Sequence, residues 1–321
     1  MMNKIIGAID CGTNSTRLLI IDDDKNQIYR DSRVTRLGQN VDKEKNLDED
    51  AVSRTLKVLK DYFEIGQSFN VTEWGLIATS AVRDSKNSQY FIKAVRDLFG
   101  VTPMLLSGYK EAVLSFKGAM SGLESTKERV VVIDIGGGST EVISGLQLDY
   151  LNSNYEAGKF VSNALGGSID IGCVRLTERF FKSDPVDRND LEKAFKYVSN
   201  LFTVVCSRYQ NLQIERVYAV AGTAISLYMV ANGIKEYSKQ GVHLKELTLD
   251  QIEATLQYLA ELPLSKRREL SGLEVGRAEV IVAGALILLV ALQKFGIKSC
   301  HVLESDILDG LALKILRQID F

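Results

Sequence analysis

The chain has 321 residues, of which 45% are apolar, so it is long enough for two domains of ordinary size, each with its own core. Its 39 Lys and Arg nearly balance its 41 Asp and Glu; the net charge of −2, without a basic stripe, argues against a nucleic-acid partner. Four scattered cysteines without a C-x-x-C spacing, and only two histidines, indicate neither a disulfide framework nor a zinc site and fit a reducing cytoplasm.

The most apolar stretch of the chain is residues 280–292. It has 13 residues, fewer than the roughly 18 to 20 that a membrane-spanning helix needs. We therefore interpret it as a buried helix and expect no membrane partner.

The first half of the chain alternates strand and helix patterns, as α/β proteins do. Its longest predicted helix has Val52, Leu59 and Phe63 on one face. The last predicted helix of this half places Glu111 in its first turn. The expected elements are strands at 5–9, 18–21 and 27–37, a helix at 48–69, a strand at 74–78, a loop at 79–83, a helix at 87–100, a strand at 104–106 and a helix that opens at 107–112.

The second half begins in the same way, so the halves look like a duplicated α/β unit. The boundary is expected near Thr126, which gives domains at 1–126 and 127–303, and a helix at 304–321 is expected to pack back on the first domain. The elements expected in the second half are strands at 130–135, 141–144 and 147–154, helices at 169–181 and 188–209, a strand at 216–220 and a helix that opens at 221–224.

Two glycine turns are copies of each other. Residues 9–16 and 133–140 share the pattern Ile-Asp-x-Gly-x-x-Ser-Thr at an offset of 134 − 10 = 124 residues. Each copy lies between two apolar runs, which predicts the tight turn of a β-hairpin. Glycine and small hydroxyl residues let backbone N–H groups approach an anion, and an Asp beside the turn can hold a cation. The pair therefore indicates a clamp for a chain of phosphates with a divalent metal.

Seven blocks of the chain, in the same order, resemble the exopolyphosphatase and guanosine pentaphosphate phosphohydrolase (Ppx/GppA) family. This resemblance implies an α/β fold of two ribonuclease-H-like domains, of the actin and hexokinase type, with the active site in the cleft between them. The length corresponds to the short, two-domain form of the family. The blocks are Asp10-x-Gly12-Thr13-Asn14-Ser15-x-Arg17-Leu18, Ala78-Thr79-Ser80-Ala81-x-Arg83, Ser107-Gly108-x-x-Glu111-Ala112, Asp134-x-Gly136-Gly137-Gly138-Ser139-Thr140-Glu141, Gly172-x-Val174-Arg175-Leu176-Thr177-Glu178, Ala221-Gly222-Thr223-Ala224 and Arg277-Ala278-Glu279-Val280-Ile281.

The resemblance implies that Glu111 is the catalytic carboxylate that orients and deprotonates the attacking water, with Arg83 in the catalytic set. By position alone, Glu111 could also be a first-turn carboxylate favoured by the helix macrodipole. The family usually has a second acid just before this Glu, where this chain has Lys110.

The resemblance also implies a phosphate-binding set. Arg17 and Arg83 match family positions at or near phosphate, where a planar guanidinium can pair bidentately with phosphoryl oxygens. Arg277 fits a family position that faces the cleft. The expected phosphate-binding residues are Gly12, Thr13, Asn14, Ser15, Arg17, Gly136, Gly137, Gly138, Ser139, Thr140 and Arg277.

Three carboxylates are candidates for a metal site. Asp134 and Glu141 lie seven residues apart and flank the second glycine turn, and hard oxygen ligands of this kind suit Mg²⁺. Asp10 is their counterpart in the first half, although it could equally accept hydrogen bonds from its own turn.

The function predicted from these residues is that of an exopolyphosphatase, which releases the terminal phosphate of polyphosphate with Mg²⁺ and a water activated by Glu111. Hydrolysis of guanosine pentaphosphate at its 5′ end is the nearest alternative, because the motifs are common to both. A kinase of the sugar or acetate type and a non-enzymatic alarmone-binding protein also stay open. A homodimer is compatible with the sequence, which does not decide the oligomeric state.

Overall fold

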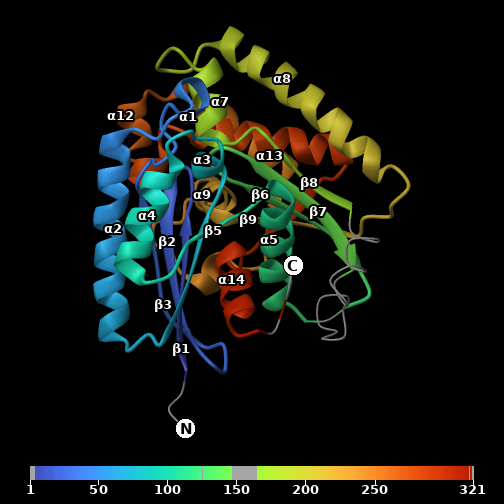
Figure 1. The fold of residues 1–321 in the computed structure, drawn as a ribbon. Coiled ribbons are helices and arrows are strands. Elements are labelled where there is room, and N and C mark those ends of the chain that lie inside the picture. The colour runs from blue at the N-terminus through green and yellow to red at the C-terminus, as the bar shows by residue number, and fades with distance from the viewer. Residues whose placement is uncertain (1–3, 125, 147–164, 318, 320–321) are drawn as a thin grey trace. The chain divides into compact units, whose positions relative to one another are not determined.

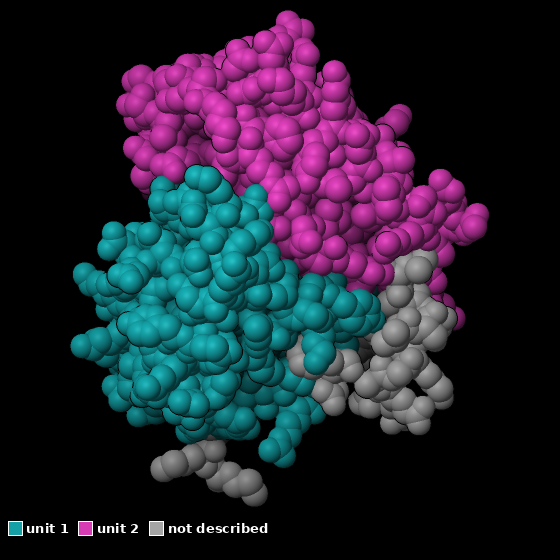
Figure 2. All heavy atoms as spheres, turned by 45° about the horizontal axis from the view of Figure 1, so that its top comes forward, with its two compact units in different colours: residues 1–123, 153–157, 305–321 teal, residues 124–152, 158–304 magenta. Residues whose placement is uncertain are grey.

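The computed structural model describes residues 4–124, 126–146, 165–317 and 319 (Figure 1). The chain forms two compact units, which Figure 2 shows in different colours. Unit 1 contains the described residues of 1–123 and 305–321, and unit 2 contains those of 124–304. The chain thus passes from one unit to the other at 123/124 and 304/305, close to the divisions expected at 126 and 303.

Unit 1 is built on a five-stranded sheet with the strand order β3-β2-β1-β4-β5. The first three strands form an antiparallel meander, and β4 and β5 run parallel to β1. Alternate residues of β1 enter different cores, since Ile9 and Cys11 belong to one apolar cluster and Ile6 and Ala8 to another. The strands are β1 Ile5–Cys11, β2 Ser15–Asp22, β3 Gln27–Val34, β4 Glu73–Ala78 and β5 Met104–Leu105.

Helices cover both faces of this sheet. Helices α2 and α4 contribute to the cluster around Ile9, and α5 and α14 to the cluster around Ile6 (Figure 1). The side chain of Ser107 caps α5 by accepting a hydrogen bond from the Lys110 N–H, which sets Glu111 in the first turn. The helices are α1 Val41–Glu44, α2 Glu49–Ser68, α3 Ser80–Arg83, α4 Ser88–Phe99, α5 Gly108–Ser121 and α14 Ile307–Ile315.

Unit 2 is built on a six-stranded sheet with the order β10-β11-β9-β6-β7-β8. Strands β6, β7 and β8 form an antiparallel meander and β9 runs parallel to β6, which repeats the arrangement of β1, β2, β3 and β4. The predicted duplication is therefore confirmed in the sheet topology. The strands are β6 Arg129–Ile135, β7 Thr140–Leu146, β8 Leu165–Ile169, β9 Arg216–Val220, β10 Lys245–Thr248 and β11 Ser299–Val302.

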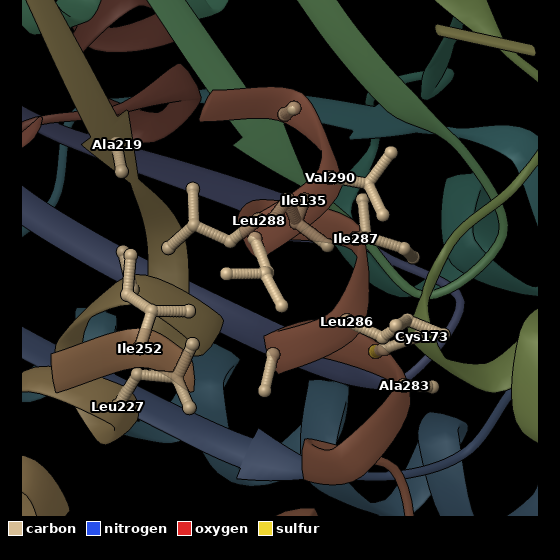
Figure 3. Close-up of a cluster of buried hydrophobic side chains, with 14 of the residues drawn as sticks. Ile135, Cys173, Ala219, Leu227, Ile252, Ala283, Leu286, Ile287, Leu288 and Val290 are labelled. Carbon is tan, nitrogen blue, oxygen red and sulfur yellow. The ribbon is translucent and has the colours of Figure 1, made fainter. Parts of the chain in front are cut away.

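The core of unit 2 surrounds α13, as Figure 3 shows. Every residue from Ile281 to Leu292 is buried, which confirms the helix expected at 280–292. Among the described helices, none is long and apolar enough to cross a membrane. The helices of the unit are α7 Cys173–Phe180, α8 Arg188–Cys206, η2 Ser207–Tyr209, α9 Ala221–Ala231, α10 Lys239–Val242, α11 Leu249–Glu261, α12 Leu264–Arg267, η3 Val275–Arg277 and α13 Ile281–Phe295.

Three local predictions were wrong. The loop expected at 79–83 contains the short helix α3, and the third strand ends at Val34. The helix expected at 169–181 is present as α7 but begins only at Cys173, because Ile169 is the last residue of strand β8 and residues 170–172 connect the two. Strand β8 could not be predicted from residue propensities, because it contains Gly166 and Gly167 and glycine is unfavourable in strands. The strand expected at 147–154 lies outside the described residues.

Candidate functional site

The first glycine turn joins β1 to β2, and backbone N–H groups of residues 35–38 donate hydrogen bonds to its carbonyl oxygens. The Gly12 N–H donates to the Ser15 carbonyl (3.0 Å) and closes the turn. The Thr13 carbonyl accepts from the Gly38 N–H (2.9 Å), and the Asn14 carbonyl accepts from the Thr35 and Arg36 N–H groups (3.0 and 2.8 Å). In a trans peptide the C=O and the next N–H point in opposite directions. The N–H groups of Asn14 and Ser15 therefore point away from this support, as an anion-binding nest requires.

The side chain of Asn14, in the same turn, is buried without a hydrogen-bond partner. It is 5% exposed, and neither its amide nitrogen nor its amide oxygen has a hydrogen-bond partner. Buried polar atoms are nearly always paired, so an orphaned pair of this kind inside the turn suggests a bound ligand.

Asp10 and Arg17 face each other at the base of this turn. They are register partners across the hairpin, and Arg17 donates from Nε and Nη2 to Oδ2 of Asp10 (3.1 and 2.7 Å). Nη1 of Arg17 donates to Oδ2 of Asp306. All three guanidinium nitrogens thus bind carboxylates, and the expected role of Arg17 as a phosphate fork stays a prediction.

Asp10 keeps one oxygen outside this ion pair. The residue is 4% exposed, and its Oδ1 is buried without a hydrogen-bond partner. Burial raises the pKa of Asp10, and the Arg17 charge opposes the shift only in part. Among the described residues, Arg17 is the donor to the Asp10 carboxylate and the turn itself donates nothing to it, whereas a cation or its water would satisfy Oδ1.

Glu111 and Arg83 form a second polar pair in unit 1. Glu111 is 7% exposed, and Nη1 of Arg83 donates to its Oε2 (3.2 Å) and to the Leu106 carbonyl (3.0 Å). Arg83 lies at the end of α3, directly after β4, and Glu111 lies in the first turn of α5. The structure therefore brings together the two residues expected to be catalytic, with one carboxylate oxygen fixed by a cation.

The second glycine turn joins β6 to β7 in unit 2 and has the same closure, with the Gly136 N–H donating to the Ser139 carbonyl (3.0 Å). The N-terminus of α7 supports it. Cys173 N–H donates to the Gly136 carbonyl (2.9 Å), and the Val174 and Arg175 N–H groups donate to the Gly137 carbonyl (2.9 and 3.1 Å). By the same peptide geometry, the N–H groups of Gly137 and Gly138 point away from α7.

Asp134 and Glu141 are register partners beside this turn. Both are buried, and Glu141 Oε1 accepts from the Ser168 hydroxyl (2.7 Å). At an offset of 124 residues, Glu141 stands where unit 1 has Arg17. Unit 1 therefore has a neutralised acid-base pair at this position, and unit 2 has two facing carboxylates, which favour a cation between or beside them.

Two further predicted residues of unit 2, Thr140 and Arg277, lie at the start of β7 and at the end of η3. Thr140 donates through Oγ1 to the Ile171 carbonyl (2.6 Å), so it supports the turn from inside. Arg277 lies over Gly222 at the start of α9, where a Cβ on Gly222 would be 2.2 Å from Cζ of Arg277. Nε of Arg277 also donates to Glu274 (2.8 Å). Ala221 adopts a left-handed φ of 65°, a strained conformation that is common at functional sites.

The described residues contain no group of three or more Asp, Glu, His or Cys that could hold a metal by itself. Mg²⁺ typically binds one or two carboxylates and keeps waters or phosphate oxygens as its other ligands. Both the facing pair in unit 2 and the orphaned oxygen of Asp10 fit such an ion.

Sequence reasoning missed Asp306, Asp309 and Arg30. Asp306 is the N-cap of α14, and Arg30 on β3 donates to both aspartates (3.2 and 3.1 Å). The only available signal was the Asp306-x-x-Asp309 spacing, a capping-box pattern that predicts a helix start and not a link to Arg17.

Comparisons with known proteins match the chain over both units. A family model described as the Ppx/GppA phosphatase family matches residues 18–318. The protein named exopolyphosphatase 2 from Mycobacterium tuberculosis is 33% identical over 327 residues, which cover 97% of this chain and 98% of that protein. The crystal structure of an exopolyphosphatase-like protein superposes with a TM-score of 0.87 at 28% identity over 99% of both chains. The crystal structure of the Ppx/GppA family member from Aquifex aeolicus superposes with a TM-score of 0.77 at 28% identity, covering 99% of this chain and 100% of that one.

Proposed function

The chain belongs to the Ppx/GppA phosphatase family and is a phosphoanhydride hydrolase, and from this premise we propose that it is an exopolyphosphatase that releases terminal orthophosphate from inorganic polyphosphate. The observation that carries the proposal is the buried Glu111 carboxylate held by Arg83 in the unit that contains the first glycine turn. The similarity over nearly its full length to a protein named exopolyphosphatase 2 supports the choice of substrate.

In the proposed reaction, Glu111 accepts a proton from a water molecule. The water oxygen attacks the terminal phosphorus, the bridging P–O bond breaks, and orthophosphate leaves a chain that is one phosphate shorter. Arg83 keeps the carboxylate oriented through Oε2, so the base does not have to reorganise during the reaction.

The backbone of the two glycine turns is proposed to bind the phosphates. In each turn, two successive carbonyls are held by N–H groups of the protein, so two successive N–H groups point the other way. The Asn14 amide, buried without a partner, would add a further donor in the first turn. Arg277, expected in the phosphate-binding set, keeps that proposed role.

A divalent ion, when bound, would stabilise the negative charge of the leaving phosphate. Within unit 1, Asp10 is proposed to meet such an ion or its water through Oδ1, and within unit 2 the facing carboxylates of Asp134 and Glu141 are proposed for the same task. Mg²⁺ is the ion whose preference for oxygen ligands these residues match.

Phosphate release tests the proposal. Long-chain polyphosphate, guanosine pentaphosphate, and ATP with and without an acceptor are assayed in parallel with Mg²⁺. Release from polyphosphate is expected. Release from guanosine pentaphosphate alone would make the chain an alarmone phosphatase, transfer from ATP only to an acceptor would make it a kinase, and binding without release would make it a sensor.

Glu111→Gln tests the assigned base. Loss of a positioned general base lowers kcat by about 10²- to 10⁴-fold, while KM should stay within several-fold because the shape is kept. Glu49→Gln is the matched control, since Glu49 is an exposed carboxylate in the first turn of α2 in the same unit. Equal turnover in the Glu111 variant and the wild type would remove Glu111 from the mechanism.

A further inference from the structure

Asp306 is a buried carboxylate that the proposed reaction does not use. It is 2% exposed, lies two residues after the chain enters unit 1, and caps α14 by accepting the Leu308 N–H at Oδ1 (2.9 Å). Arg17 and Arg30 both donate to it. Burial alone would raise the pKa of Asp306, but these two cations outweigh burial and lower it, so the group is an anion at neutral pH.

Arg17 connects Asp306 to the first glycine turn. One edge of the guanidinium holds Oδ2 of Asp10, and the remaining nitrogen holds Asp306. The guanidinium is planar and rigid, so fixing Nη1 on Asp306 also fixes the direction in which Nε and Nη2 meet Asp10. The consequence is that Oδ2 of Asp10 is occupied and Oδ1 is left as the oxygen without a partner.

The backbone of Asp306 also packs directly against α5, the helix that carries Glu111. A Cβ on Gly118 of α5 would lie 1.7 Å from the Asp306 carbonyl oxygen, and a Cβ on Gly310 of α14 would lie 2.2 Å from the Leu114 carbonyl oxygen. Helices α5 and α14 therefore meet backbone to backbone, which only glycine allows at these positions. The location of Asp306 is thus set by the same helix pair that sets Glu111.

We propose that Asp306 is a positioning residue, which acts through Arg17 to orient Asp10 so that Oδ1 of Asp10 is presented to the divalent ion that accompanies the phosphates. The inference rests on the proposed function for its metal and its phosphate substrate. Asp306 itself touches neither, because its oxygens are engaged by Arg17, Arg30 and the Leu308 N–H.

Asp309 provides a matched control. It lies on the same helix, it also pairs with Arg30, and its Oδ2 accepts the Asp306 N–H (2.9 Å). Its carboxylate binds Arg30 and the Asp306 N–H and does not contact Arg17. Asp306→Asn and Asp309→Asn therefore make the same chemical change one helical turn apart, and only the first removes the carboxylate that holds Arg17.

The test measures Mn²⁺ binding by electron paramagnetic resonance with inorganic phosphate present, and the Mg²⁺ concentration that gives half the maximal rate of phosphate release. Substitutions of residues that orient metal ligands typically cost about 10- to 100-fold in metal affinity or activity. We expect at least a tenfold weakening of both quantities in Asp306→Asn and less than threefold in Asp309→Asn. In an Asp10→Asn background, Asp306→Asn should cost nothing further, because the amide oxygen pairs with Arg17 and the NH2 group in place of Oδ1 cannot bind a cation.

Arg17→Lys keeps the charge but lacks the planar fork that meets two carboxylates at fixed angles, and it should reproduce the Mn²⁺ defect even if Asp306→Asn fails to fold. Three results would overturn the inference: equal defects in the two α14 variants, losses that multiply when Asp306→Asn is added to Asp10→Asn, or a wild-type protein without Mn²⁺ affinity. If polyphosphate is not the substrate, the Mn²⁺ comparison still decides the role of Asp306, so the two proposals fail separately.

Discussion

Gly172 lies so close to the second glycine turn that any side chain at this position would overlap the backbone of the turn. It directly precedes α7, and a Cβ at this position would lie 2.4 Å from the Gly137 carbonyl carbon and 2.5 Å from the carbonyl oxygens of Gly136 and Gly137. Side-chain carbons rarely approach backbone atoms more closely than about 3.4 Å, since cores are packed to contact distance. In Gly172→Ala, the turn or the start of α7 must therefore move by about 1 Å.

The magnitude follows from what that displacement disturbs. Three hydrogen bonds, from Cys173, Val174 and Arg175 to the carbonyls of the turn, span this contact. Overpacking costs about 1 to 3 kcal/mol, and each of the three weakened hydrogen bonds up to about 1 kcal/mol, so the free energy of unfolding should fall by about 1 to 6 kcal/mol. A shift of about 1 Å in groups that position substrate can lower the rate about 100-fold.

The assay compares Gly172→Ala with Gly167→Ala. Among the described residues, a Cβ on Gly167, in β8, meets only Nη1 of Arg208 at 3.7 Å, an ordinary contact with the end of a flexible side chain. Phosphate release from polyphosphate is measured well below the unfolding temperature of both variants, and stability is measured by urea unfolding. The Gly172 variant should lose about 100-fold in kcat/KM and the Gly167 variant less than threefold, because only the former displaces the turn.

Two outcomes would refute this reasoning. Near-normal kcat/KM in Gly172→Ala would mean that the Gly137 and Gly138 N–H groups do not bind the substrate. Equal losses in both variants would mean that unit 2 responds to any added methyl group, whatever its distance from the turn.

The remaining predictions concern stability. Gly118→Ala should lower the free energy of unfolding by about 3 kcal/mol in urea titrations, because the added Cβ would lie 1.7 Å from the Asp306 carbonyl oxygen and force α5 and α14 apart; a neutral effect would show that the two helices separate freely. Burial raises the pKa of Cys173 and Cys206 to about 11 and that of Cys300 to about 12. Because the unfolded thiols ionise near pH 8.5, the stability that these groups contribute is complete below that pH and declines as the pH rises toward 11 to 12. Urea unfolding between pH 7 and 10 should show this decline, and Cys300→Ala should flatten it; an unchanged slope in that variant would contradict the assignment.

The duplicated hairpins illustrate what could be read from the sequence. Each turn, its two flanking strands and the register across it involve residues that are close in the chain, so an offset of 124 residues was sufficient to align Asp10 with Asp134 and Arg17 with Glu141. Both hairpins form with the aligned register partners. The buried helix at 280–292 was also predictable, because an apolar run that is too short for a membrane has to be covered by protein.

Other features gave weaker local signals. Strand β8 is rich in glycine and follows a segment outside the described residues, so no propensity argument identified it. Gly172 belonged to a recognised motif, but the motif did not indicate that a side chain at this position would contact the backbone of Gly136 and Gly137. The close approach of two segments, 137 and 172, depends on how β7, β8 and α7 fold back on β6.

By itself, the sequence determined the repeated α/β units, the two glycine turns and the candidate base Glu111, since each depends on short-range patterns or on a family motif. Only the tertiary structure decided the partners of the charged residues. Arg17 had the residue type of a phosphate ligand, but it binds Asp306, which lies 289 positions away. A buried cation takes the carboxylates that folding places around it, and these come from distant parts of the chain.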